Sequence, residues 1–374
     1  MTTMLATHSG QLERWLGKDA VDNVSRHMRN WYGPPIAVGG VPGRVYACGG
    51  GDFRGRIIEG RFATALDHVE GVARRVARAA RRTARNQATQ LNAGFSSFSD
   101  LVAELSQGKR RDFRWNKVGA TGVIQVTNSL WGLGPQPAAG ANAAAAPGGE
   151  APTDATTGAI PFTNPTGGDT QHIINGWANC EDLGNSLLVY DRIFQVNKTM
   201  NSTATEAVTG VPTRYQAGSG DDYSAGNFLF VEVGGTALAA TAHNWTVCTY
   251  TDQDGNAGAT LPSLVGNSGA IVRRLDHPVG QFFAPLATGD HGVRALTQMQ
   301  CSAAVATGVI NFVIGHPLFM IPLPLANTSC MVDGLNTAAS LVRVFDDAAL
   351  ALLELMKPST SATTYTVGLT TCAG

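Results

Sequence analysis

The sequence has few charged side chains: only 15% of its 374 residues are Asp, Glu, Lys or Arg, whereas 44% are hydrophobic and 44 residues are glycine. Charged residues are depleted where protein surfaces are buried against a neighbour. The sequence also lacks any run of about 18 apolar residues, which a membrane-spanning helix requires. Its start, MTTMLATHSGQLERW, has no basic segment followed by an apolar run. We therefore expect a protein with large protein contacts, no membrane span and no signal peptide.

The sequence also lacks closely spaced pairs of cysteines. The six cysteines are scattered, with no Cys-X-X-Cys motif and no histidine at zinc-ligand spacing. This pattern indicates neither a zinc site nor a disulfide framework. We expect free, mostly buried thiols in a protein made in a reducing cytoplasm. The six are Cys48, Cys180, Cys248, Cys301, Cys330 and Cys372.

Motifs that carry chemistry are also missing. No phosphate-binding glycine pattern follows a strand and opens a helix. Ser268 stands between glycines as a serine-protease nucleophile does, but no histidine and aspartate can be assigned to it, so a turn is favoured. Asp252 and Asp254 resemble the start of a calcium loop without its later ligands, and an Asp-Gly hairpin turn is favoured for them. We predict no catalytic residue, no cofactor and no metal site, and therefore no enzyme.

Charge is unevenly distributed along the chain. Residues 1–120 contain 19 Lys and Arg against 10 Asp and Glu, and residues 121–374 contain 8 against 18, which gives net charges of +9 and −10. A basic segment of this kind usually meets an anionic partner.

The strongest positive feature is an arginine ridge on a helix predicted over residues 59–91, which lacks proline and is rich in Ala, Arg and Leu. At 100° per residue its arginines share one face. Three interpretations stay open: a solvated face, contact with an acidic protein surface, and contact with a nucleic-acid backbone. With a second basic group after the next helix, the candidate contact residues are Arg74, Arg75, Arg78, Arg81, Arg82, Arg85, Lys109, Arg110 and Arg111.

Four segments follow from these patterns. Residues 1–92 form a helical, basic N-terminal arm, with short helices within 10–32 and a Gly- and Pro-rich connector over 33–56. Residues 93–131 hold a helix and a first strand that lead into the body. Residues 132–168 form an Ala-, Pro-, Gly- and Thr-rich loop, either mobile or ordered only by a neighbour. Residues 169–374 form a β-rich body.

In the 93–131 segment we expect a helix over Ser97–Leu105, capped by Ser97 or Ser99 and ended by Gly108, and a strand over Val123–Thr127.

The body shows many short apolar or alternating runs separated by turn residues. This predicts a mainly β fold, namely an antiparallel sandwich of the jelly-roll type. The exception is DDAALALLELM, Asp346–Met356, which predicts a helix. The predicted strands are Ser186–Val196, Phe228–Val233, Asn244–Tyr250, Gly269–Arg273, Val293–Cys301, Gly308–Ile314, Leu318–Leu325 and Tyr365–Leu369.

Six segments in order resemble a family of bacteriophage virion structural proteins, which includes capsid coat, decoration and head-associated proteins. Residues 1–90 show no such resemblance. The segments are FSSFSDLVAELSQGKRRDFRWNK (95–117), HIINGWANCEDLGNSLLVYDRI (172–193), TGVPTRYQ (209–216), NWTVCTYTDQDGNAG (244–258), FFAPLATGDHGVRALTQMQCS (282–302) and RVFDDAALALLELM (343–356).

The resemblance implies an assembly role without catalytic residues. We expect a capsid cement or decoration protein, found in the virion and made in the host cytoplasm. Its expected partners are the major capsid protein and neighbouring copies in a homo-oligomer such as a trimer, with packaged DNA as a further partner of the basic arm and no membrane. The alternatives are a major capsid subunit, a tail or fibre protein, and a DNA-contacting packaging protein that acts through the arginine ridge.

Overall fold

A computed structural model describes residues 36–37, 44–45, 95, 97–121, 124–181, 185–216, 226–337, 341–356 and 359–374. The chain divides into two compact units, Met1–Ala88 and Thr89–Gly374. In the first unit, the described residues form the antiparallel pair β1 (Ile36–Ala37) and β2 (Arg44–Val45), within the predicted connector. The helices predicted within residues 10–32 and over 59–91, with the six arginines of the ridge, lie outside the described residues.

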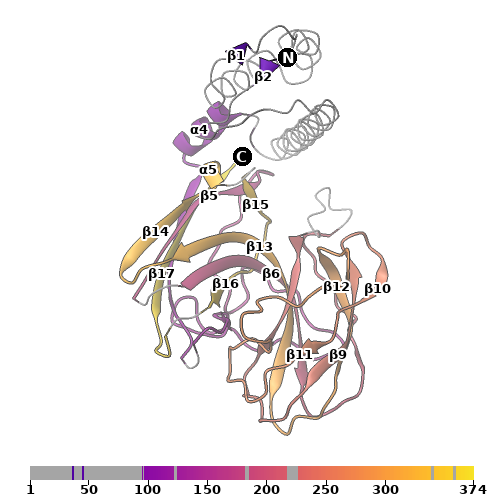
Figure 1. Ribbon diagram of the computed structural model, residues 1–374. Coiled ribbons are helices and arrows are strands. Elements are labelled where there is room, and N and C mark those ends of the chain that lie inside the picture. Colours follow the sequence, from indigo (N-terminus) through magenta and orange to yellow (C-terminus); the bar gives the residue numbers. More distant parts are fainter. Residues whose placement is uncertain are drawn as a thin grey trace. The chain divides into compact units, whose positions relative to one another are not determined.

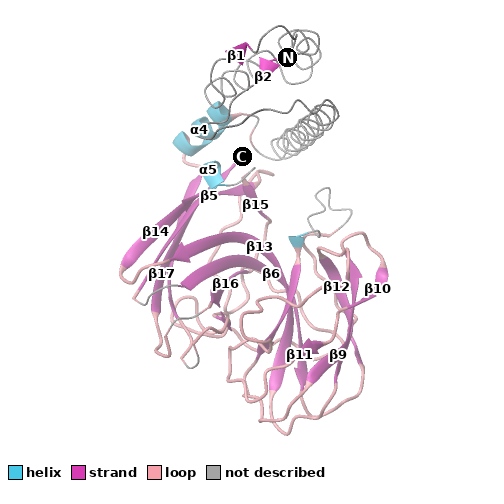
Figure 2. Cartoon of the chain, viewed as in Figure 1, coloured by secondary structure: helices cyan, strands magenta, loops and turns pink. Residues whose placement is uncertain are grey.

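The second unit is mainly β, as predicted, and its strands form three five-stranded antiparallel sheets (Figures 1 and 2). The central sheet has the order β4 (Asn128–Ser129), β16 (Leu350–Leu355), β6 (Asn185–Thr199), β13 (Val309–Leu323), β8 (Phe228–Val233). The β5 sheet has the order β14 (Thr328–Asp333), β5 (Gln171–Cys180), β17 (Thr364–Ala373), β3 (Arg110–Val118), with β15 (Val342–Val344) also on β5. The β9 sheet has the order β10 (Ala257–Thr260), β9 (Asn244–Asp252), β12 (Val293–Cys301), β7 (Glu206–Ala207), with β11 (Leu264–Val265) also on β9.

The two longest strands of the central sheet, β6 and β13, have 15 residues each and pair with each other from end to end (Figure 1). They are long enough to contact both outer sheets. Side chains alternate between the faces of a strand. Leu187 and Val189 enter the apolar core shared with the β5 sheet. After a shift of register near Arg192, Phe194 and Val196 enter the core shared with the β9 sheet. One central sheet therefore supports both outer sheets.

The central sheet also closes on itself through residues 273–276. On one side, Val233 N donates to Arg274 O over 2.9 Å, so that this segment extends the sheet beyond its edge strand β8. On the other side, Ser129 N donates to Arg273 O over 2.8 Å, next to the opposite edge strand β4. The result is a closed ring of strands, whose interior is filled by side chains such as Tyr190 and Phe230.

The helix predicted over Asp346–Met356 is wrong. Leu350–Leu355 forms β16, which pairs with β6 on one side and with β4 on the other. All six of its residues are buried. A strand that is covered on both faces is mostly apolar, as β16 is apart from Glu354, so its sequence lacks the alternation that separates a strand from a helix. Tertiary packing here overrides the helix propensity of Ala and Leu.

Two predicted strands are also wrong. The described residues of Val123–Thr127 form a turn and an irregular stretch, with Gln125 at φ +60°. Gly269–Arg273 forms turns, with Arg273 at φ +81°. The first long strand is instead the basic segment β3, in which half-buried Phe113 and buried Trp115 alternate with exposed Arg114. Apolar and polar residues alternate in the sequence of β3, but its many charged residues hide this pattern.

The other predicted strands lie within or overlap observed ones, and Phe228–Val233 and Val293–Cys301 have the observed bounds. The strands β5 and β10 were not predicted, because glycine, alanine and asparagine interrupt their apolar pattern, and β14 was not predicted, because it begins with two polar residues and ends with Asp333.

The segment 132–168 is a loop, as predicted, but contacts with its own unit order it. Ile160 and Phe162 are 1% and 7% exposed and pack in the core between the central and β5 sheets. Ile160 N donates to Leu350 O over 2.8 Å. No neighbouring subunit is needed to place this part of the loop.

Helix α4 (Phe98–Ser106) confirms the prediction around Ser97, whose side chain accepts a hydrogen bond from Asp100 N, and Gly108 follows the helix at φ +84°. The short helix α5 (Gly334–Thr337) was not predicted. We expect Ser97→Ala to lower the free energy of unfolding by about 1 kcal/mol, since one helix amide loses its acceptor. Urea denaturation measures this loss, and hydrogen exchange at the Asp100 amide should accelerate. Unchanged exchange there would contradict the cap.

Candidate functional site

A buried ion pair lies inside the closed ring of the central sheet. Arg192 of β6 donates from Nη2 to Oε1 of Glu232 over 2.6 Å and from Nη1 to Oε2 over 3.2 Å. The two side chains are 0% and 4% exposed. Both charges are thus removed from water and are held in a bidentate geometry that suits arginine and carboxylate.

Polar neighbours complete this pair. Gln195 Oε1 accepts from Arg192 Nε over 2.6 Å, and Tyr190 Oη accepts from Arg192 Nη1 over 3.3 Å. Asn311 Nδ2 donates to Glu232 Oε1 over 3.0 Å. All three guanidinium nitrogens and both carboxylate oxygens therefore have partners, as a buried ion pair requires.

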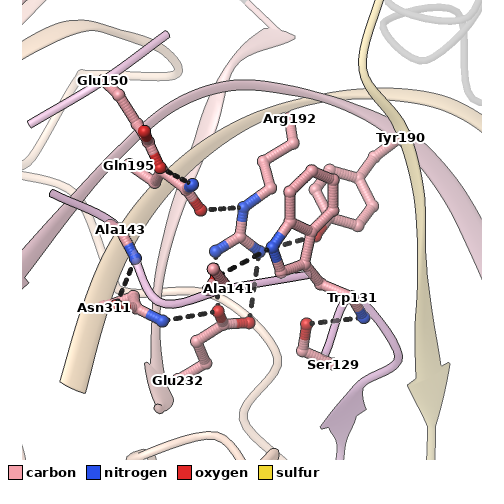
Figure 3. A network of polar contacts seen from close by, with 10 residues as sticks. All are labelled: Ser129, Trp131, Ala141, Ala143, Glu150, Tyr190, Arg192, Gln195, Glu232 and Asn311. Carbon is pink, nitrogen blue, oxygen red and sulfur yellow. Dashed lines mark hydrogen bonds and ion pairs between the residues drawn. The ribbon is translucent and has the colours of Figure 1, made fainter. Parts of the chain in front are cut away.

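The same network holds the first part of the Ala- and Gly-rich segment (Figure 3). The Trp131 ring lies 4.7 Å from the Arg192 guanidinium carbon, and its Nε1 donates to Ala141 O over 3.3 Å. Ala143 N donates to the Oδ1 atom of Asn311 over 3.2 Å, and Gln195 Nε2 donates to Glu150. We call these residues, with Ser129, Tyr190 and Glu232, the ring network.

Electrostatics keep the ring network ionised. Burial alone would raise the pKa of Glu232, but the Arg192 guanidinium and its hydrogen bonds outweigh burial and hold this pKa below its ordinary value. Burial raises the pKa of Tyr190 to about 12, so its phenol stays protonated at neutral pH. The network therefore fixes the geometry of Arg192, Glu232 and Tyr190 inside the ring.

A second buried pair lies one residue earlier on β6. Arg214 donates from Nε and Nη2 to the two oxygens of Asp191, over 2.8 and 2.7 Å. Asp191 Oδ1 also accepts from Ala349 N over 3.0 Å, just before β16. Burial raises the pKa of Asp191 above its ordinary value although Arg214 opposes this. Asp191 and Arg192 thus anchor different parts of the chain to β6.

Of the predicted contact residues, the structure describes Lys109, Arg110 and Arg111, which it brings together at the start of β3, the edge strand of the β5 sheet. Lys109 Nζ lies 2.9 Å from Glu104 Oε2 and 3.0 Å from Asp169 Oδ2. Arg110 pairs with Asp112, and Arg111 Nη1 donates to Gly108 O. All three are partly or fully exposed. Whether they contact a partner stays a prediction.

The glycine-flanked Ser268 is exposed in a turn, as predicted. The nearby histidine is occupied: His243 Nε2 lies 3.0 Å from Asp276 Oδ2, and His243 Nδ1 lies 3.0 Å from Thr241 O. Although burial opposes it, the hydrogen bond with Asp276 raises the pKa of His243, which favours an imidazolium that donates from both nitrogens. Such a ring has no free nitrogen to accept a serine proton.

The Asp252 turn is a hairpin, as predicted, between β9 and β10. Its carboxylate accepts from the backbone of Asp254 and Asn256 over 2.9 and 2.8 Å, so its own loop uses these oxygens. Within the described ranges, no cluster of three His, Cys, Asp or Glu side chains could hold a metal ion. The described cysteines are free, and four of the five are buried.

Sequence reasoning missed both buried pairs. Their signal is a charged residue inside a continuous apolar strand: Asp191 and Arg192 in LLVYDRIFQV, and Glu232 in FLFVEV. Charged side chains are almost never fully buried unless they are paired. A strand of this composition therefore predicts a buried partner, although the sequence does not say which one.

Comparisons with known proteins give no family. No protein-family model and no curated protein matches the chain. Among solved structures, a chain of infectious bursal disease virus, Gt strain, matches with 9% identity and a TM-score of 0.16, covering 71% of this chain and 79% of that one. A chain of the Gx strain matches with 8% identity and a TM-score of 0.11, covering 71% of this chain and 41% of that one. Both are chains of virus structures.

In the part of the chain that the structure describes, no helix has the length and apolar character needed to cross a membrane.

Proposed function

We propose that the chain is a structural component of a bacteriophage particle, a capsid cement or decoration protein that binds and stabilises the head shell. The observation that supports this most is the position of the six segments that resemble phage virion proteins. All six fall within Thr89–Gly374, and they contain the whole of α4, β9, β12 and β16. The resemblance thus covers elements of all three sheets and avoids the basic arm.

The surface of the β5 sheet favours contacts with neighbouring subunits. Its edge strand β14 pairs with β5 in regular register and contains no lysine, arginine or proline. Met331, at the middle of β14, is 69% exposed. Unprotected edge strands can pair with another chain, and most proteins block them with such residues. The proposed partners are the major capsid protein and further copies in a homo-oligomer such as a trimer.

We further propose that the protein is not an enzyme, acts in the virion and is made in the host cytoplasm. The occupied ring of His243 and the fully partnered ring network support a structural role. The alternative from another functional class is a packaging protein that contacts DNA through the arginine ridge. The arginines of the ridge lie outside the described residues.

Particles assembled with and without the chain test the proposal. We expect shells without it to form in normal yield but to lose resistance to heat and to low salt, and the purified protein to restore both on addition. Failure of any shell to form would instead indicate a major capsid subunit, and normal shells without tails would indicate a tail or fibre protein.

A further inference from the structure

Two cationic side chains meet the same short loop, residues 132–137, without an acidic partner. Lys117 lies near the end of β3 and is 2% exposed, and its Nζ donates its one hydrogen bond to Pro137 O over 3.1 Å. The backbone of β3 continues this contact, because Val118 N donates to Gly134 O over 2.9 Å. Lys117 is therefore fixed at one end of the loop.

Arg273 is fixed at the other end. Its guanidinium lies directly over Gly132, where an added Cβ would stand 2.0 Å from the guanidinium carbon. Arg273 has φ +81°, a left-handed conformation that is unfavourable for a residue with a side chain. Backbone hydrogen bonds to Val233 and Ser129 hold it there. The guanidinium group of Arg273 is therefore positioned by two features: the absence of a side chain at Gly132 and the left-handed backbone of Arg273.

The charges around this loop are not balanced. Within the described ranges, no carboxylate lies at ion-pair distance from Lys117 or Arg273, and the Arg273 guanidinium makes no hydrogen bond. Burial, with Arg273 adding to its effect, lowers the pKa of Lys117 to about 8. Burial also lowers the pKa of Arg273; the nearby carboxylate of Glu232 opposes this effect but is already paired with Arg192. Lys117 is buried and Arg273 is half-buried, and charges in such positions are normally paired, so two neighbouring cations without an ion pair indicate a missing anion.

We propose that Lys117 and Arg273 form a binding site for an oxyanion, a phosphate or carboxylate group, beside residues 132–137. The partly exposed guanidinium supplies a planar pair of donors, and the buried ammonium supplies a point charge. The group is either a free phosphate ion or the carboxylate of an acidic side chain on a neighbouring subunit. The site does not depend on the proposed function.

Binding of inorganic phosphate to the purified full chain tests the site. We expect saturable binding by calorimetry and a rise in melting temperature relative to sodium chloride of equal ionic strength. Arg273→Gln should weaken phosphate binding at least tenfold, and Lys117→Met, which removes the buried charge without opening a cavity, should do the same. Arg111→Gln, the matched control on the exposed start of β3, should bind as the unchanged protein does.

Phosphate also stabilises proteins non-specifically, through exclusion from their surface. An equal rise in melting temperature in all four proteins, without saturable heat, would overturn the proposal. Sedimentation velocity distinguishes the sources of the anion. If a neighbour's carboxylate fills the site, phosphate and Arg273→Gln both weaken self-association, whereas a free-ion site leaves it unchanged.

A pH series adds an independent readout. The groups around Lys117 are Arg273, Tyr365 directly opposite on β17, and Glu354, which accepts from Tyr365 Oη over 2.5 Å. Sulfate keeps its charge across neutral pH and is the suitable probe. Its affinity should fall several-fold as the pH rises above 8, because Lys117 loses its proton. An affinity that is constant between pH 7 and pH 9 would contradict a role of Lys117 in binding.

Discussion

Replacing Glu232 with glutamine is expected to lower the free energy of unfolding by about 3–5 kcal/mol, the usual effect of leaving one member of a buried ion pair alone. Glutamine keeps the shape of the side chain, but Arg192 then carries an unpaired charge in an interior where both side chains are almost fully buried. Urea denaturation at pH 7 measures the loss. Because Asn311 and Gln195 contact the same pair, part of the effect should spread to the segment 131–150.

Two variants separate charge from packing. The double variant Arg192→Met with Glu232→Leu removes both charges and should recover most of the stability, since apolar residues of similar volume often replace a buried pair without loss. Glu150→Gln, at the partly exposed end of the same network, should change stability by less than about 1 kcal/mol. A double variant as unstable as Glu232→Gln would show that shape, and not charge, controls this site.

Limited proteolysis of the Glu232→Gln variant measures directly how far the effect spreads to the segment 131–150. Residues 132–168 have mostly small side chains, so their apolar contacts are small apart from those of Leu133, Ile160 and Phe162. The ring network contacts this segment at Ala141, Ala143 and Glu150, and backbone hydrogen bonds pair residues 144–150 with Gln195 and Asn197 of β6. We therefore infer that the ring network and the backbone pairing with β6 together specify the position of a segment whose own sequence cannot. A polar cluster that gives a unique structure at some expense of stability is known from other proteins.

The sequence predicts those parts of the fold that depend on neighbouring residues, and it does not predict those that depend on distant ones. Alternation and turn residues predicted the mainly β body, and the local rule of a serine cap and a following glycine predicted α4. Both signals are carried by neighbouring residues. The position of 132–168 depends instead on partners such as Gln195 and Asn311, which are distant in the sequence.

The β16 strand shows the same limit in the core. Five of its six residues are apolar, the exception being the buried Glu354, and its pairing with Ser186–Asp191 of β6 and with β4 selects a strand over a helix. The candidate anion site is also non-local, since Lys117 and Arg273 are brought to one loop by β3 and by the segment that closes the ring. Neither residue stands in a motif.

The protein should lose stability steeply in mild acid. Burial lowers the pKa of His172 and of His277 to about 4, and that of His316 to about 3. In the unfolded chain these rings take up protons near pH 6.5. Between pH 6.5 and 4 the unfolded state therefore binds more protons than the folded state, and stability falls as the pH falls. Three such groups give a slope of up to about 4 kcal/mol per pH unit.

Denaturation in urea at pH 7, 6, 5 and 4.5 measures this slope. His277→Gln should reduce it by about 1.4 kcal/mol per pH unit, because glutamine can accept the hydrogen bond of Val231 N without taking up a proton. His291→Gln, at an exposed position, should leave it unchanged. His243 acts in the opposite direction: its raised pKa means that its pair with Asp276 weakens as the pH rises above 6.5. Stability should therefore be highest near neutral pH, and a slope that His277→Gln does not reduce would show that other groups cause the acid sensitivity.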